Sequence, residues 1–145
     1  MKAVDAARGD RIVSLIRDQG GRVTTARRAL VTALVEAHGH VTAEDLATMV
    51  QRAQPDVHLS TIYRSLDALE RIGVVDHVHL GHGRAVYHLT DEPHQHLVCD
   101  LCGAVVEVPD ATFADLGDTL RRRYGFTIRP SHFAVLGRCR ACSRS

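Results

Sequence analysis

Apolar positions in the first half of the chain recur every three or four residues, the period of a helix with one buried face. Four such segments follow one another; their apolar positions are Ile12, Leu15 and Ile16, then Ala26, Leu30, Ala33, Leu34 and Ala37, then Leu46, Met49 and Val50, and last Ile62, Leu66, Leu69 and Ile72. Helix starts are expected at Thr24 or Thr25, at Thr42 and near Ser60. Gly20, Gly39 and Gly73 are the matching stop signals, so we expect four helices.

After Gly73 the period changes from 3.6 to 2, which is typical of a strand. Residues 74–80 place Val75, His77 and His79 on one face, residues 81–83 supply a turn, and residues 84–89 return as a second strand. Helices followed by a hairpin are the order of a winged helix-turn-helix, in which the helix at about 60–72 would enter the major groove of DNA. The alternative is a small helical domain whose polar helix face only meets water.

Residues 90–93 are polar and end in proline, so a hinge is expected over residues 90–95, between a DNA-binding domain at 1–89 and a second domain at 96–145. In the second domain we expect strands at 97–99, 104–108 and 131–136 and a helix from about Asp110. That helix carries a stripe of apolar residues, Phe113, Leu116, Leu120 and Tyr124, which we expect to be mostly core. So small a domain has little interior, which favours pairing of two copies into a homodimer that reads two-fold symmetric DNA. The fold class is α+β, with a winged helix-turn-helix before a small α/β dimerisation domain.

Composition sets bounds on the partners. No apolar run approaches the roughly 18 residues of a membrane span and the first residues lack the apolar core of a signal peptide, so we expect a cytoplasmic protein without membrane partners. Net charge is +1, which excludes a global electrostatic argument for nucleic acid. Residues 8–28 hold six arginines against two aspartates, a net +4, but arginines on a solvated helix face are common.

All four cysteines lie in two Cys-x-x-Cys knuckles, Cys99 with Cys102 and Cys139 with Cys142. Each knuckle bends a turn so that two thiolates meet one ion, and two knuckles complete a four-cysteine structural zinc site. Redox pairs, disulfides or inert buried thiols are the alternatives. They are less favoured because a thioredoxin-type motif needs one knuckle in a βαβ setting, which neither knuckle has.

Ten histidines are many for 145 residues, and two pairs of them share a strand face. The pairs are His77 with His79 and His94 with His96. Sites rich in imidazole suit nickel, iron, zinc or copper, and affinity order does not choose among these metals. The alternative for His77 and His79 is a solvated wing near DNA phosphates.

The motifs His40-Val-Thr-Ala-Glu-Asp-Leu46, Ser60-Thr-Ile-Tyr-Arg64, His94-x-His96-Leu-Val-Cys-x-x-Cys and the terminal Cys-x-x-Cys together resemble the ferric uptake regulator (Fur) family of metal-dependent bacterial repressors. The resemblance runs through nearly the whole chain. It implies a homodimeric winged-helix repressor that binds DNA when metal-loaded, and an inter-domain regulatory site formed by His40, His88, His94 and His96, with Glu107 as a further ligand. The residues expected to contact DNA are Arg22, Arg27, Ser60, Thr61, Tyr63 and Arg64; Ser65 is expected on the same outward face.

Departures from the family pattern decide the subgroup. Pro93 and Gln95 stand where a second Fur-type site commonly has ligands, and neither can serve. Residues 76–83 resemble the wing of the nickel-uptake regulators (Nur), which implies a nickel site of His77, His79 and His132. We therefore expect nickel as the regulatory metal, with zinc or iron as the alternative.

Two other classes of function are weaker. The chain has no Ser-His-Asp order, phosphate loop or His-Glu-x-x-His that would indicate catalysis. A zinc-dependent hydrolytic enzyme would need a general base, for which Glu107 is the one candidate. A zinc-stapled protein-interaction module would leave both histidine pairs unexplained.

Overall fold

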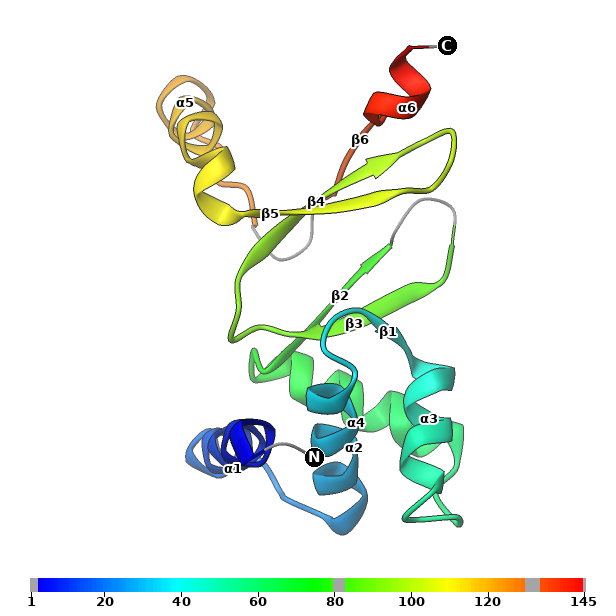
Figure 1. Cartoon of the computed structure of the whole chain (residues 1–145). Helices are drawn as coiled ribbons and strands as arrows, with labels where there is room; N and C mark the ends of the chain where they lie inside the picture. The colour runs from blue at the N-terminus through cyan, green and yellow to red at the C-terminus, as the bar shows by residue number, and fades with distance from the viewer. Residues whose placement is uncertain (1–2, 80–82, 130–133, 145) are drawn as a thin grey trace. The chain divides into compact units, whose positions relative to one another are not determined.

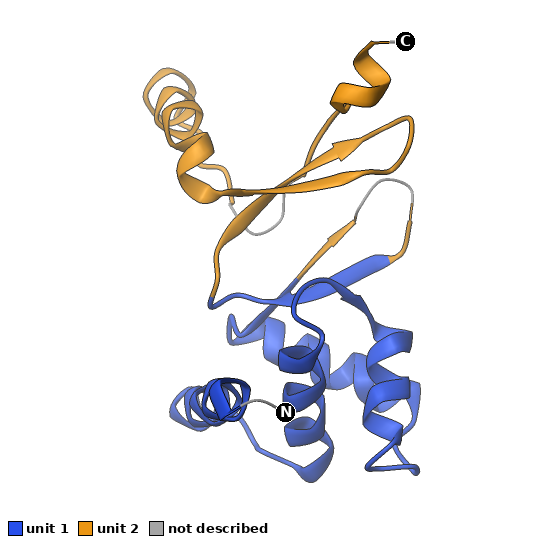
Figure 2. Ribbon diagram, viewed as in Figure 1, with its two compact units in different colours: residues 1–76, 85–91 blue, residues 77–84, 92–145 orange. Residues whose placement is uncertain are grey.

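The computed structural model describes residues 3–79, 83–129 and 134–144 (Figure 1). The chain divides into two compact units (Figure 2). The first, the helical unit, comprises residues 1–76 and 85–91. The second comprises residues 77–84 and 92–145 and holds all four cysteines, so we call it the cysteine unit.

The four helices expected in the first half of the chain are confirmed: α1 (Ala3–Asp18), α2 (Thr25–Glu36), α3 (Ala43–Gln51) and α4 (Leu59–Arg71). The Thr24 hydroxyl caps α2 by accepting the Arg27 amide at 3.1 Å. Thr42 caps α3 in the same way, accepting the Asp45 amide at 3.1 Å, and its hydroxyl donates to the Asp45 carboxylate at 2.8 Å. Both caps bind amide groups that the first helical turn leaves without partners, which fixes where each helix begins.

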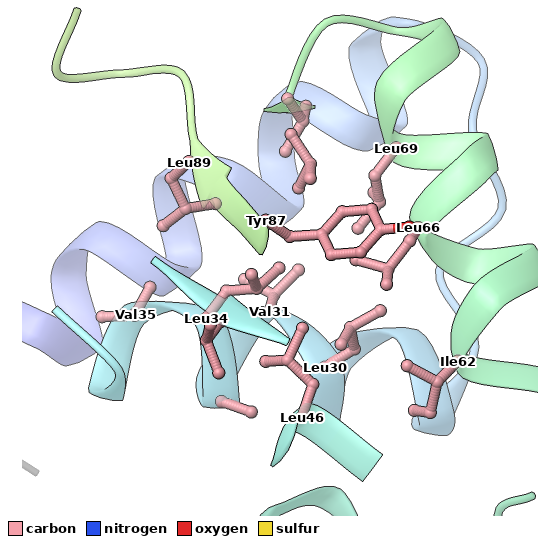
Figure 3. Packing of buried hydrophobic residues seen from close by; sticks show 14 of the residues in the cluster. Leu30, Val31, Leu34, Val35, Leu46, Ile62, Leu66, Leu69, Tyr87 and Leu89 are labelled. Carbon is pink, nitrogen blue, oxygen red and sulfur yellow. The ribbon is translucent and has the colours of Figure 1, made fainter. Parts of the chain in front are cut away.

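The core of the helical unit lies where the helix stripes meet β3 (Figure 3). Leu30, Leu46, Ile62 and Leu66 are among its fully buried side chains. Two details differ from expectation. Leu15 is 44% exposed, because Val13 takes the place on the buried face of α1.

Ser65 is the second difference, since only 7% of it is exposed. It lies three residues after Ile62 and four before Leu69, so it shares their buried face and is not on the outward face of α4.

A three-stranded sheet closes the helical part of the chain, with strand order β1-β3-β2. The expected hairpin strands are β2 (Val75–His79) and β3 (Ala85–Leu89); the turn expected at residues 81–83 falls largely outside the described residues. Strand β1 (Val41–Thr42) was not predicted, because two residues are too few to show a period. It pairs antiparallel with β3, Val41 opposite Tyr87.

The cysteine unit contains a second sheet in the order β5-β4-β6. Its strands are β4 (His94–Cys99), β5 (Val105–Pro109) and β6 (Ala134–Gly137); a 3-10 turn η1 (Asp110–Phe113) leads into α5 (Ala114–Tyr124), and α6 (Arg140–Ser143) follows β6. β4 begins three residues before the strand that we expected. The helix expected from Asp110 starts as the 3-10 turn, α6 was not predicted, and residues 131–133 of the expected last strand lie outside the described residues.

The apolar stripe of α5 is not core in this single chain, contrary to expectation. Leu116 is 46% exposed and Tyr124 is 72% exposed. Within the described part of residues 92–144, the buried apolar side chains are Val98 and Cys99. Burial of a stripe requires a facing layer, and this unit alone supplies little of one. Among the described residues, no helix is long and apolar enough to cross a membrane.

Candidate metal centres and nucleic-acid interface

The parallel pairing of β4 with β6 brings the two cysteine knuckles together. Cys99 ends β4 opposite Gly137 of β6, and the chain reaches Cys139 two residues later. The four cysteines each offer a sulfur, and these four atoms lie within 4.8 Å of one another. The Sγ atoms of Cys102 and Cys139 are 3.7 Å apart. Residues 37 positions apart therefore meet at one point, as the spacing predicts.

This arrangement fits a tetrahedral zinc ion. Four thiolates at the usual zinc–sulfur distance of about 2.3 Å are separated by roughly 3.8 Å, close to the Cys102–Cys139 separation. A disulfide would need sulfurs about 2.05 Å apart, and none of the four cysteines is in one. The disulfide alternative is therefore not realised in this structure.

The titration behaviour of the sulfurs agrees with a cation site. Backbone N–H groups of Cys102 and Cys139 lower the pKa of Cys99 to about 6, so this sulfur is a thiolate at neutral pH. The neighbouring Cys139 sulfur raises the pKa of Cys142 to about 12. Adjacent thiolates oppose one another's ionisation, and a divalent cation is what allows all four to ionise together.

A second group of metal-ligand types lies on the sheet of the same unit. His94 and His96 share one face of β4 with ring centroids 4.8 Å apart, and Glu107 of β5 is opposite His96. Ligand atoms of these three residues lie within 4.8 Å of one another. The His94 Nδ1 lies 2.8 Å from the Glu92 carbonyl oxygen and must donate to it, because a carbonyl only accepts. This leaves Nε2 with the lone pair that a metal needs.

The other two histidines of the expected inter-domain site lie in the helical unit. His40 directly precedes β1, and His88 is a buried residue of β3. Their ring centroids are 4.9 Å apart with the rings tilted by 53°. The pairing of β1 with β3 produces this proximity, and sequence periodicity gave no sign of that pairing.

Of the expected nickel ligands, two are described. His77 and His79 lie two apart on β2, with ring centroids 5.6 Å apart and the rings nearly perpendicular. His77 is half-buried and His79 is exposed. His132 lies outside the described residues.

Helix α4 presents the polar side chains that we expected to meet DNA. Ser60, Tyr63 and Arg64 are exposed and Thr61 is half-buried. The Tyr63 hydroxyl donates to the Glu44 carboxylate of α3 at 3.3 Å, which orients the ring. Near the start of α2, Arg22 is exposed, and Arg27 donates to the Arg22 carbonyl at 2.6 Å. Arg22 and Arg27 thus lie beside a helix N-terminus, where backbone amides favour phosphate.

One supporting residue that sequence reasoning treated only as a lost ligand is Gln95. It is buried between His94 and His96 in sequence, and its amide donates to the Asp110 carboxylate at 2.7 Å. This bond ties the histidine-bearing strand to the turn before α5. A polar residue on the alternate face of a ligand strand was the signal that could have indicated it.

Four helices and a hairpin, followed by a small sheet with a four-thiol cluster and paired imidazoles, are the features that we expected of a metal-binding regulator of transcription. Residues 18–135 match the model of the Ferric uptake regulator family. The ferric uptake regulation protein of Bacillus subtilis (strain 168) is 33% identical over 139 residues, covering 92% of this chain and 93% of that protein.

Solved structures agree with the match. A ferric uptake regulator from Pseudomonas aeruginosa with manganese superposes with a TM-score of 0.72 at 32% identity, covering 88% of this chain and 96% of that one. A zinc uptake regulator complexed with zinc and DNA superposes with a TM-score of 0.67 at 26% identity, covering 99% and 97%.

The chain belongs to the Ferric uptake regulator family. Its fold is that family's helical DNA-binding region followed by an α/β domain. It is therefore a metal-responsive transcriptional regulator and not an enzyme, which excludes the hydrolase alternative.

Proposed function

We propose that this regulator is a nickel-responsive repressor that acts in the cytoplasm as a homodimer on two-fold symmetric operator DNA. The observation that carries the nickel assignment is the pair His77 and His79, whose rings lie 5.6 Å apart at right angles on the wing strand. Imidazoles without thiolate suit nickel among other metals, and carboxylate oxygens of Glu70 and Asp76 lie within 4.8 Å of a ligand atom of His77. We include His132 as the third ligand because the Nur resemblance implies it.

The four cysteines hold a structural zinc in this proposal. The support is the sulfur spacing, with Cys102 and Cys139 at 3.7 Å, and the chemistry of four thiols in one cluster. When bound, zinc would offset part of the negative charge of the four thiolates and join β4 to α6. The chain supplies the backbone amides that keep Cys99 ionised.

A second regulatory metal is proposed at His40, His88, His94 and His96, with Glu107 as a further ligand. Each pair of histidines is close within its own unit, His40 with His88 at 4.9 Å and His94 with His96 at 4.8 Å between ring centroids. We propose that residues 1–89 bind DNA, that residues 90–95 are the hinge, and that residues 96–145 dimerise. A metal that binds both pairs favours one arrangement of the domains and thereby the DNA-competent state.

The homodimer is supported by apolar surface. Val106, Phe126 and Leu136 are exposed in the single chain together with Leu116 and Tyr124 of α5. A surface of this kind on so small a unit favours a second copy as its cover. The proposed DNA contacts are Arg22, Arg27, Ser60, Thr61, Tyr63 and Arg64.

Zinc or iron is the second candidate for the regulatory metal. The buried His96 beside the Glu107 carboxylate favours it, because a mixed imidazole and carboxylate set suits both ions.

The test is metal-dependent DNA binding. The zinc-containing protein would be used to select DNA fragments in the presence of metal, and affinity for them would be titrated with nickel, zinc, iron(II) and manganese. His77→Ala combined with His79→Ala should abolish the gain given by nickel while zinc content and the dimer stay unchanged. His38→Asn is the matched control, since it removes an exposed imidazole and asparagine tolerates the positive φ of 49°. A double variant that still responds to nickel as the parent does would overturn the nickel assignment.

A further inference from the structure

An ion pair joins α1 to a residue far along the chain. The Arg8 guanidinium donates twice to the Asp91 carboxylate, Nε to Oδ2 at 2.8 Å and Nη2 to Oδ1 at 2.6 Å. The two residues are 83 positions apart. Two parallel bonds from a planar guanidinium fix direction as well as distance, which a lysine could not do. Arg8 lies outside the part of the chain that matches the family model, which begins at residue 18.

The surroundings keep this pair formed. The side chain of Arg8 is 16% exposed and that of Asp91 is 40% exposed, so the guanidinium is largely removed from water. Its hydrogen bonds hold the pKa of the Asp91 carboxyl below the usual value, so the carboxylate stays charged at neutral pH.

Asp91 is the last residue of the helical unit, and Glu92 is the first of the following segment of the cysteine unit. The backbone carbonyl of Glu92 accepts a hydrogen bond from the His94 Nδ1–H at 2.8 Å. Pro93 lies between them with its φ fixed by the ring. The segment between Asp91 and His94 is therefore restrained at both ends, by the ion pair on one side and by a metal-ligand histidine on the other.

We propose that Arg8 and Asp91 are a positioning pair that limits the hinge to Glu92 and Pro93 and so couples metal binding at His94 to DNA binding. This rests on the proposed function. Coupling between two sites requires that an ordered element between them be biased by both. If Thr90 and Asp91 were also free to move, their motion would absorb the conformational change that metal binding causes at His94, and that change would not reach the helices.

The coupling itself tests the pair. The variants are Arg8→Ala, Asp91→Asn, both together, and the charge swap Arg8→Asp with Asp91→Arg, in the full zinc-containing protein. The readout is the ratio of DNA dissociation constants without and with added iron(II), an ion that suits the mixed imidazole and carboxylate set of His94, His96 and Glu107. A partly buried bidentate pair should change that ratio by about twofold to fivefold. Each single variant should lower the ratio, the double variant no further, and the swap should recover part of it.

Charge gives an internal control. By electrostatics alone, Arg8→Ala weakens and Asp91→Asn strengthens DNA binding without metal. Both should nevertheless lower the ratio, which a simple charge effect on DNA cannot do. Arg17→Ala, an exposed arginine on the same helix, should leave the ratio unchanged. Ratios that stay at the parent value, or that move in opposite directions in the two single variants, would overturn the proposal.

Hydrogen exchange separates this inference from the proposed function. In Arg8→Ala without added iron(II), the amides of Glu92 and His94 should exchange at least about twofold faster, because the ion pair no longer restrains the segment. If the parent protein shows no metal-dependent DNA binding, the proposed function fails, but faster exchange still supports the restraint. Unchanged exchange overturns the restraint whatever the metal response.

Discussion

The two units of this regulator hold their folds by different means. The helical unit buries leucine, isoleucine and valine from all four helices in one cluster with Tyr87 and Leu89 of β3; Figure 3 labels members from α2, α3 and α4 beside the two β3 residues. Residues 92–144 of the cysteine unit, where described, bury Val98 and Cys99 and leave Leu116, Tyr124 and Phe126 exposed. A core of the first kind is sufficient alone, whereas the second kind depends on a bound ion and a partner surface. One chain thus combines a helical unit with a large apolar core of its own and a second unit that, in our proposal, a bound zinc ion and a second copy stabilise.

The largest expected effect is that of replacing a cysteine of the four-thiol cluster, which should affect the cysteine unit and not the helical unit. Cys99→Ser or Cys139→Ser should unfold the cysteine unit and leave the helical unit folded, because the free energy of structural zinc binding, about 10–16 kcal/mol in small zinc domains, is part of folding. Circular dichroism and hydrogen exchange would follow the two units separately. Ala141→Ser, in the same knuckle, keeps all four thiols and should change little. A well-folded, dimeric serine variant would show that zinc is not structural.

Truncating one leucine in each unit tests the same difference between their cores. Leu66→Ala, in the core of the helical unit, should lower its free energy of unfolding by about 2–5 kcal/mol. Leu116→Ala removes the same atoms from a half-exposed site, so it should barely change the unfolding of the monomer and should instead weaken the dimer. Urea unfolding and sedimentation measure the two effects. Equal losses of stability at both sites would mean that the α5 stripe is core after all.

The next effect concerns the helical unit as the reader of DNA. Arg64→Ala should weaken operator binding by about 1–3 kcal/mol if it contacts a guanine edge, with zinc content and dimer intact. Arg71→Ala, an exposed arginine in the last turn of the same helix, is the control and should cost less. Fluorescence anisotropy with labelled operator gives both values. Unchanged affinity of Arg64→Ala for every DNA tested would place the reading contact elsewhere.

The smallest effect is the acid dependence of the Arg8–Asp91 pair. The folded state holds the pKa of Asp91 below its ordinary value of 3.8, so the pair stabilises the fold fully above that pH and progressively less as pH falls through the lower folded value. The free energy of unfolding of the parent should therefore exceed that of Asp91→Asn by up to about 1 kcal/mol near neutral pH, and this difference should shrink below pH 4. Urea unfolding of both proteins across this range measures it. A difference independent of pH would contradict the assignment to an ionised Asp91.

Local signals in the sequence predicted the helical unit well. The capping residues Thr24 and Thr42 and the stripes of α2 and α4 act within one or two helical turns, so the sequence carries them directly. Ser65 was misplaced because its polarity suggested the outward face, whereas its position relative to Ile62 and Leu69 decides its burial. The knuckle spacing of the cysteines likewise predicted their meeting.

Strand pairing between distant segments, and the burial of a surface by another copy of the chain, were harder to predict from the sequence. The closeness of His40 and His88 depends on β1 pairing with β3, and a two-residue strand leaves no period to read. The α5 stripe looked like core because apolar periodicity does not tell an internal layer from a surface that another copy covers. The ion pair of Arg8 with Asp91 could not be predicted, because nothing in the sequence relates two charged residues 83 positions apart.

The meeting of β4 with β6 also sets an order of events during synthesis. Cys102 and Cys139 are 37 positions apart, which at translation rates of about 5–20 residues per second corresponds to roughly 2–7 s. In that interval the helical unit, complete at Asp91, is free to fold, while Cys99 and Cys102 have no second knuckle to share an ion with. The nascent protein therefore passes through a brief period in which its DNA-binding region exists before the half that carries the second knuckle, and the thiols of Cys99 and Cys102 are then open to oxidants.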